Sequence, residues 1–171
     1  MKLIIINGPC GIGKSTLAAR LHDRMPLSFL LDVDAQARFI SHYREFTEER
    51  REMVHAVSLG IIEACLKINR SVIVDKMIFH PEILDTYHEM GKRYKAEIHE
   101  VILWAPKDVV MVRAQARGWK EGGLLTPEKC ERFWDEIDQM KSQRILAKII
   151  DVNGLTEDEA LQRLVGRIAV I

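Results

Sequence analysis

The sequence predicts an α/β fold in which a five-stranded parallel sheet is wrapped by helices. Strand-like and helix-like stretches alternate along all 171 residues, which is typical of parallel strands joined by helical crossovers. The strand-like stretches are short apolar runs, and three of them end in an aspartate or an asparagine. The helix-like stretches carry apolar residues three and four positions apart. We expect one domain spanning residues 1–171, long enough to bury its own core.

The elements are expected in a regular order. Buried strands are predicted at residues 3–7, 28–32, 71–75, 98–104 and 145–152. Helices are predicted at residues 15–24, 34–42 and 47–69, and others begin near Pro81, Pro106, Pro127 and Thr156. Proline suits the first turn of a helix because its missing N–H has no partner to lose there. Thr156 and Glu159 form the capping-box pattern at the start of the last helix.

Three predicted helices carry a clear apolar face. In the helix 47–69 this face is Val54, Val57, Ile61, Cys65 and Ile68. After Pro81 it is Ile83, Tyr87, Met90 and Tyr94, and after Pro127 it is Cys130, Phe133, Trp134, Ile137 and Met140. Amphipathic helices usually pack this face against their own domain, so we interpret all three as core.

Composition restricts the class of protein. The 25 Lys and Arg residues balance 25 Asp and Glu residues, and this neutrality disfavours a nonspecific nucleic-acid binder, which needs a basic face. No apolar run approaches the roughly 20 residues that cross a bilayer, and no signal-peptide pattern follows Met1. Cys10, Cys65 and Cys130 show neither metal-ligand spacing nor a disulfide framework. We therefore expect reduced thiols in a cytoplasmic protein without membrane association.

Residues 8–16 read GPCGIGKST and match the phosphate-binding loop pattern between an apolar strand and a helix. The glycines let the backbone turn tightly, so that its N–H groups surround a polyphosphate at the positive end of the helix. Lys14 is expected to bridge the β- and γ-phosphates, Ser15 to bind Mg²⁺ and Thr16 to meet the α-phosphate. The predicted nucleotide-binding set of this phosphate-binding loop is Gly8, Pro9, Cys10, Gly11, Ile12, Gly13, Lys14, Ser15 and Thr16.

Two acids close the second predicted strand. If that strand continues, Asp32 and Asp34 point to the same side, at the carboxyl edge of the sheet where ligands bind. One is expected to orient and deprotonate a substrate hydroxyl while the other supports Mg²⁺; the alternative is that either caps the next helix. Arg38 lies one helical turn beyond Asp34, where it is expected to hold an anionic substrate or to pair with Asp34.

Four further residues complete the predicted site. Asp75 ends the apolar strand VIVD and is expected to hold a Mg²⁺-bound water or a substrate group, or else to be a turn residue. Arg113 and Arg117 lie one helical turn apart before the stretch RGWKEGGLL. We predict that they stabilise the transferred phosphoryl group beneath a lid at residues 117–126, the alternative being favourable charge at a helix C-terminus. Asn153 is expected to line the adenine pocket by its position, or to form a turn.

Together these motifs resemble those of the small P-loop kinases related to nucleoside monophosphate kinases. The stretches NGPCGIGKST, FLLDVD, VIVDKMIFHPE and VRAQARG are similar to motifs of gluconate and shikimate kinases, polynucleotide kinases, zeta toxins and antibiotic phosphotransferases. The resemblance implies a P-loop NTPase three-layer sandwich with strand order 2-3-1-4-5, and ATP and Mg²⁺ as ligands. It also implies Asp34 as the substrate base and Arg117 as a lid arginine. Residues 35–70 carry no sequence signature for a particular phosphoryl acceptor. The NKxD motif, which would indicate guanine specificity, is absent.

The predicted function is ATP-dependent transfer of the γ-phosphate to a hydroxyl group of a nucleoside, sugar or antibiotic-like molecule. Residues 33–70 are the expected acceptor-binding region, and the protein is expected to be a monomer or a homodimer. One alternative is a polynucleotide 5′-hydroxyl kinase, which the HPE segment favours and the neutral charge disfavours. Another is a nucleotide-binding regulatory ATPase without an acceptor.

Overall fold

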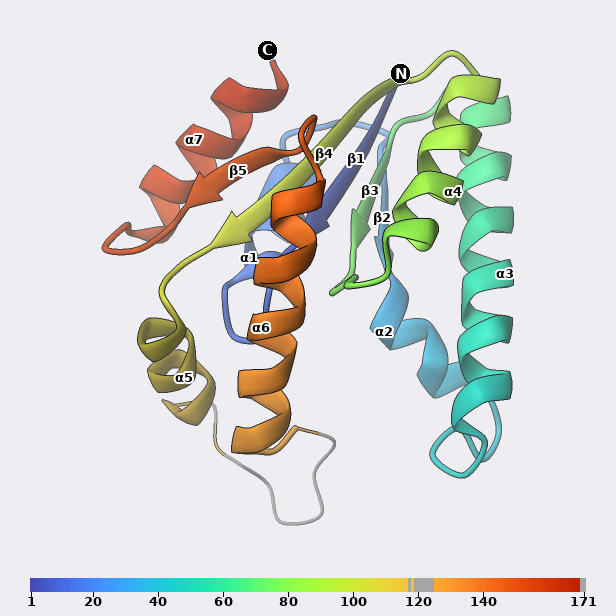
Figure 1. Cartoon of the computed structure of the whole chain (residues 1–171). Coiled ribbons are helices and arrows are strands. Elements are labelled where there is room, and N and C mark those ends of the chain that lie inside the picture. Colours follow the sequence, from blue (N-terminus) through green and yellow to red (C-terminus); the bar gives the residue numbers. More distant parts are fainter. Residues whose placement is uncertain (117, 119–124, 170–171) are drawn as a thin grey trace.

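The computed structural model describes residues 1–116, 118 and 125–169, and within them a five-stranded sheet lies between helices (Figure 1). The strands are β1 (Lys2–Asn7), β2 (Phe29–Asp32), β3 (Val72–Asp75), β4 (Glu97–Trp104) and β5 (Lys148–Asp151). All pairings are parallel and the order is β2-β3-β1-β4-β5, which confirms the predicted fold class. The carboxyl ends of β1, β2 and β3 therefore meet at one edge of the sheet.

The helices alternate with these strands as predicted. They are α1 (Lys14–His22), α2 (Val33–Gln36), the 3-10 helix η1 (Ala37–Phe39), α3 (Thr47–Lys67), α4 (Pro81–Arg93), α5 (Lys107–Ala116), α6 (Pro127–Gln143) and α7 (Glu157–Ile168). The helix expected at 34–42 is replaced by the short pair α2 and η1, and the strand expected from 145 begins at Lys148. Within the described ranges, no helix is both long and apolar enough to cross a bilayer.

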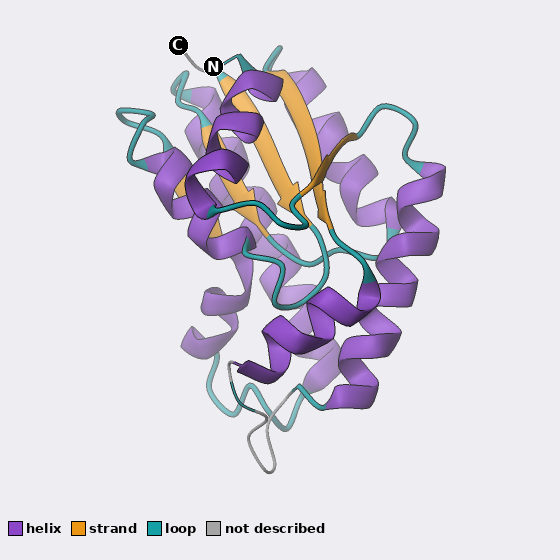
Figure 2. Cartoon of the chain, turned by 90° about the vertical axis from the view of Figure 1, so that its left-hand side faces the viewer, coloured by secondary structure: helices purple, strands orange, loops and turns teal. Residues whose placement is uncertain are grey.

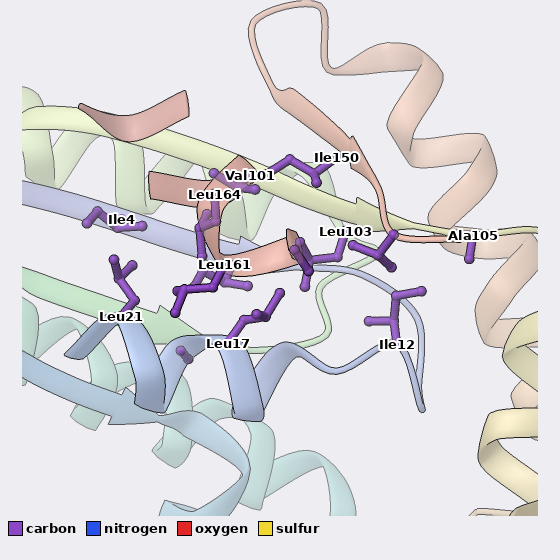
Figure 3. Packing of buried hydrophobic residues seen from close by; sticks show 14 of the residues in the cluster. Ile4, Ile12, Leu17, Leu21, Val101, Leu103, Ala105, Ile150, Leu161 and Leu164 are labelled. Carbon is purple, nitrogen blue, oxygen red and sulfur yellow. The ribbon is translucent and has the colours of Figure 1, made fainter. Parts of the chain in front are cut away.

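The sheet lies between layers of helices, as the turned view in Figure 2 shows, and an apolar cluster packs on each of its faces. Successive side chains of β1 alternate between them: Ile4 and Ile6 pack towards α1 and α7, whereas Leu3 and Ile5 pack towards α3, α4 and α6. Figure 3 shows the first cluster, where Leu17 and Leu21 of α1 meet the leucines of α7. Complete burial on both faces explains why β1 reads as an uninterrupted apolar run.

The inner face of α3 differs from the predicted one. Val57 and Ile68 are 45% and 67% exposed, so the prediction that they lie in the core was wrong. The buried residues are Val54, Ser58, Ile62 and Leu66, which follow a spacing of four. The polar Ser58 interrupts the apolar pattern, and its hydroxyl donates to the side-chain oxygen of Gln36 at 3.3 Å. Because serine is polar, a pattern of hydrophobic residues does not predict that Ser58 is buried.

The faces of α4 and α6 agree with the prediction in part. In α4, Tyr87 is buried as expected, but Leu84 and Gly91 accompany it, while the other three predicted residues lie at the cluster margin. In α6, Cys130, Ile137 and Met140 are buried, and the two aromatic residues are partly exposed. The ring nitrogen of Trp134 donates to the carbonyl oxygen of Ala105 at 2.9 Å, which anchors α6 beside the end of β4.

Candidate active site

The phosphate-binding loop leads from the end of β1 into α1. Gly8 has a φ of 145°, and a Cβ built there would lie 2.5 Å from the carbonyl oxygen of Leu103, so the loop backbone passes directly against β4. Gly13, with a φ of 102°, is the N-cap of α1 and supplies no side-chain cap. A helix that begins in this way presents its first backbone N–H groups towards the loop, an arrangement that suits an anion. The Lys14 ammonium donates to the carbonyl oxygen of Pro9 at 2.9 Å, within the same loop.

Asn7 anchors the start of this loop. Its side chain is completely buried, and its oxygen accepts from the backbone N–H of Gly8 at 2.7 Å and of Ile78 at 2.8 Å. Its amide nitrogen donates to the carbonyl oxygen of Ile78 at 2.7 Å. Asn7 therefore ties the phosphate-binding loop to the segment that follows β3. This role was not predicted, although a polar residue that ends a buried apolar strand is its signal.

Five predicted site residues lie close together around the carboxylate of Asp75. Burial raises the pKa of Asp75, which is opposed by a hydrogen bond with the Ser15 hydroxyl and by the charge of Lys14. The negative charges of Asp32 and Asp34 raise this pKa further. Asp32 lies opposite Asp75 in the β2–β3 register, and β3 pairs in turn with β1, which leads into the phosphate-binding loop. The predicted lysine, hydroxyl and three carboxylates therefore lie at one edge of the sheet.

The two acids after β2 are placed differently from each other. Asp32 lies opposite Asp75 in the β2–β3 register, at the carboxyl edge of the sheet. Its side chain accepts from the backbone N–H of Ala35 at 2.9 Å and caps α2, which was the alternative role. The strand ends at Asp32, as predicted, so the condition under which both acids would point to the same side is not met, and Asp34 lies in the first turn of α2.

Lys76 joins this cluster and was not identified from the sequence. Its ammonium forms an ion pair with the carboxylate of Asp34, while its backbone N–H donates to the carbonyl oxygen of Ile6 at 3.3 Å. The side chains are 30% and 69% exposed for Lys76 and Asp34, so both can reach a bound molecule. The available signal was a basic residue directly after the acid that ends VIVD.

A cleft of ≈ 420 Å³ adjoins the other side of the phosphate-binding loop. It lies between the start of α1, the end of α5 and the segment between β5 and α7, and Thr16 and Leu155 are among its lining residues. Arg113 also lines it, and one guanidinium nitrogen donates to the carbonyl oxygen of Val152 at 3.3 Å. The cleft is next to the loop that would hold phosphates and is large enough for a nucleoside.

Two other predicted residues, Asn153 and Arg38, are exposed. Asn153 is exposed in a turn where its N–H donates to the Asp151 carboxylate at 2.8 Å, and the cleft is lined by its neighbours Val152 and Leu155. Arg38 is exposed in η1, while Asp34 has Lys76 as its partner. Arg117 lies outside the described residues, as does most of the predicted lid.

The structure corrects the expectation that all the thiols are reduced. Cys10 of the phosphate-binding loop and Cys130 of α6 form a disulfide, with their Cα atoms 6.4 Å apart, and Cys65 is the free cysteine of the described residues. The pairing could not be inferred from spacing because the two residues are 120 positions apart and meet only when α6 packs beside the loop. Cys10 is thus a cross-linking residue as well as part of the loop.

The oxygen atoms of the cluster suit a magnesium ion. Among the described residues, no group of three His, Cys, Asp or Glu side chains could hold a metal ion alone. Mg²⁺ commonly uses one or two carboxylates and completes its shell with water and phosphate oxygens. Ser15 and Asp75, with Asp32 opposite, provide only hard oxygen ligands beside the phosphate-binding loop. This donor set fits the metal, and the loop fits the nucleotide phosphates.

Several solved structures share this fold. The tunicamycin resistance protein of Deinococcus radiodurans is 21% identical, with 99% of this chain and 96% of that chain covered and a TM-score of 0.71. A gluconokinase from Sinorhizobium meliloti 1021 is 17% identical, with 98% and 91% covered and a TM-score of 0.71. A deoxyadenosine kinase from M. mycoides is 16% identical, with 99% and 100% covered and a TM-score of 0.58.

The remaining comparisons identify the family. No curated protein matches the sequence. Residues 3–143 match the model of the AAA_33 family, which is described as an AAA domain, and this stretch includes the phosphate-binding loop and all the acids of the cluster. The chain therefore belongs to the AAA_33 family and has the P-loop, kinase-like fold of its structural neighbours.

Proposed function

We propose that the protein is an ATP-dependent kinase that transfers the γ-phosphoryl group to a hydroxyl group of a small molecule. The main support is the convergence of the phosphate-binding loop with three carboxylates and Lys76 at the ends of β1, β2 and β3. Phosphoryl transfer needs positioned phosphates, a metal anchor and a group that orients the attacking hydroxyl. A pure binding module has no need for the last of these.

Each residue of the cluster has a proposed role. The loop amides and Lys14 hold the phosphates, and Ser15 and Asp75 hold Mg²⁺, which when bound neutralises charge on the phosphate oxygens. Asp34 is the proposed base: it orients the acceptor hydroxyl and accepts its proton. Asp32 supports the metal side and caps α2, so that Asp34 is positioned by a helix rather than by a loose strand end.

The acceptor is proposed to bind over α2, η1 and α3, within residues 33–70. The exposed Arg38 and Phe39 of η1 offer it a charged and an apolar contact. The proteins with similar structures include a gluconokinase, a sugar kinase, a tunicamycin resistance protein and a deoxyadenosine kinase. We therefore propose a small hydroxyl compound of the sugar, nucleoside or antibiotic class. Arg113, with Arg117, is proposed to meet the nucleotide phosphates from the α5 side.

The proposal is tested by ADP release from ATP and Mg²⁺ across a panel of sugars, gluconate, nucleosides, aminoglycosides, amphenicols and tunicamycin. With the acceptor that responds, Asp34→Asn should lower kcat by roughly 100-fold or more while ATP affinity is kept. The matched control is Asp23→Asn, an exposed acid at the end of α1, which should retain wild-type turnover. Normal turnover of Asp34→Asn would remove Asp34 from the mechanism.

An oligonucleotide with a 5′-hydroxyl group belongs in the same panel. Salt-sensitive phosphorylation of that oligonucleotide, with no small molecule used, would replace the proposed acceptor class by nucleic acid. ATP hydrolysis that no acceptor diverts would instead favour a regulatory ATPase.

A further inference from the structure

The disulfide between Cys10 and Cys130 has no place in the proposed transfer chemistry. It links the phosphate-binding loop to the first turns of α6, and the Cα separation of 6.4 Å lies within the range that disulfides span. The two residues are 120 positions apart, so the link joins segments that no local turn holds together. It must therefore act on the loop whose shape decides phosphate binding.

The disulfide holds the middle of a loop whose two ends are held in other ways. At its start, Asn7 is hydrogen-bonded to the segment after β3, and Gly8 lies against Leu103. At its end, Gly13 is the N-cap of α1. Gly11 packs on α5, where a built Cβ would lie 3.2 Å from the backbone nitrogen of Ala114. The Cys10 side chain supplies the covalent anchor to α6. Reducing the disulfide releases this anchor and leaves the surrounding contacts in place.

The two cysteine residues differ in accessibility. Cys130 is completely buried, whereas Cys10 is partly exposed. A dithiol reductant therefore reaches the Cys10 sulfur: its thiolate attacks that atom, the bond between the protein sulfurs breaks, and the Cys130 sulfur leaves as a thiolate that takes up a proton. The second thiol of the reductant then displaces the Cys10 sulfur. Two electrons and two protons pass to the protein, and the reductant becomes a disulfide.

We propose that Cys10 and Cys130 form a reversible thiol–disulfide modification site that sets the affinity of the phosphate-binding loop for nucleotide, the oxidised form binding more tightly. In the oxidised form the loop amides are held in place before the phosphates arrive. In the reduced form the loop must be ordered on binding, which costs affinity. The proposal rests on the proposed function only for the identity of the ligand, ATP.

Thermodynamic linkage gives a second consequence. If the oxidised form binds ATP more tightly by some factor, bound ATP shifts the thiol–disulfide equilibrium towards the disulfide by the same factor. The cost of ordering one loop segment should raise the Kd for ATP by roughly 3- to 10-fold. The affinity ratio and the redox shift can be measured separately and must agree.

The experiment compares the full chain, oxidised or reduced with dithiothreitol, by calorimetric titration with Mg²⁺ and ATP. Alkylation and mass spectrometry count the thiols in each sample, and redox buffers with and without ATP measure the shift. We expect a 3- to 10-fold lower Kd for the oxidised chain. Equal or tighter binding by the reduced chain overturns the proposal, as does alkylation of Cys10 and Cys130 in the oxidised sample.

Variants separate this pair from other effects. Cys130→Ala and Cys10→Ala should each bind ATP independently of dithiothreitol. Cys65→Ala, the matched control on α3, should keep the full redox response, since burial raises the pKa of the Cys65 thiol and disfavours its reaction. The wild-type comparison decides the result if a variant fails to fold. Redox-dependent ATP binding without transfer to any acceptor would contradict the kinase proposal and leave this one standing.

Discussion

Gly8 illustrates how much of the site depends on a single backbone position. Its φ of 145° is unfavourable for other residues, and a Cβ there would lie 2.5 Å from the Leu103 carbonyl oxygen. We expect Gly8→Ala to lower the free energy of unfolding by about 3 kcal/mol, because the loop or β4 must move. Urea denaturation measures the change.

The matched control for this substitution is Gly154→Ala. Gly154 also has a positive φ, of 70°, but nothing lies within 4 Å of a Cβ built there. This substitution should lower the free energy of unfolding by about 1 kcal/mol, which is the cost of the backbone conformation alone. Equal losses in the two variants would show that the contact with Leu103 does not constrain the loop.

Lys76 is the residue whose substitution best tests the geometry around Asp34. Lys76→Met removes the cationic partner of Asp34, so the carboxylate loses its orientation. We expect kcat to fall about 10-fold with the KM for ATP nearly unchanged, and Lys76→Arg to restore most of the loss. The control Lys92→Met alters an exposed lysine on α4 and should leave both constants unchanged. A change in the KM for ATP alone would place Lys76 with the nucleotide instead.

The residues that the sequence predicted are those whose role depends on local pattern. The phosphate-binding loop is contiguous, and the acids at 32, 34 and 75 follow apolar strands, so their convergence follows from a parallel sheet. Asn7, Lys76 and the Cys10–Cys130 pair act through partners far away in the sequence. No spacing rule identifies such partners before the packing is known.

At the scale of elements, prediction succeeded where burial is uniform. The strands β1 and β3 are apolar runs because both of their faces are covered, and their bounds, like those of β2 and β4, were predicted to within one residue. Prediction failed where hydrogen bonds of polar groups, and not the burial of apolar side chains, determine the local structure. Asp32 caps α2, so that Asp34 lies on a helix and not on a continued strand, and Ser58 lies on the inner face of α3. Capping and buried hydroxyls depend on hydrogen-bond partners rather than on hydrophobic periodicity.

The capping box of α7 gives a prediction for one element. The Thr156 hydroxyl accepts from the Glu159 N–H at 3.3 Å, and the Glu159 carboxylate accepts from the Thr156 N–H at 2.8 Å. We expect Thr156→Ala to reduce the free energy of unfolding by about 1 kcal/mol, because N–H groups of the first turn lose their acceptor. Thermal denaturation monitored by circular dichroism measures it. Gln162→Ala, an exposed change in the same helix, should have almost no effect.

At the scale of the whole molecule, an ion network centred on one buried carboxylate joins α4, β4 and the end of α6. The side chain of Glu100 is 2% exposed, and its carboxylate accepts from Arg144 at 2.6 Å and approaches the ring nitrogen of His88 at 2.8 Å. Arg144 also donates to Asp85 at 2.6 Å. Burial alone would raise the pKa of Glu100, but the hydrogen bonds with His88 and Arg144 outweigh it and lower the pKa.

This network makes stability depend on pH. Because the pKa of Glu100 is lower in the folded than in the unfolded chain, its contribution is fully present above the ordinary value of 4.5 and is lost as pH falls through the folded pKa. We expect Glu100→Gln to cost about 3 kcal/mol at neutral pH, with the difference from wild type shrinking below about pH 4.5. Urea denaturation across pH measures this.

The control for the pH experiment is Glu89→Gln, an exposed acid on α4 close to the same network. This substitution should change the free energy of unfolding by less than about 0.5 kcal/mol at every pH. A Glu100→Gln curve that runs parallel to the wild-type curve down to acid pH would contradict the assigned origin of the dependence.

The sheet order has a consequence for synthesis on the ribosome. β1 emerges first, yet it occupies the centre of the sheet, between β3 and β4. Until the nascent chain has extended past Asp75, both edges of this strand, whose central residues are apolar, lack their final neighbours, and the edge that pairs with β4 stays open until Trp104 has been made. Such a strand is a target for molecular chaperones and a starting point for misassembly. The strand that leads into the phosphate-binding loop is therefore made early and completes its pairing late.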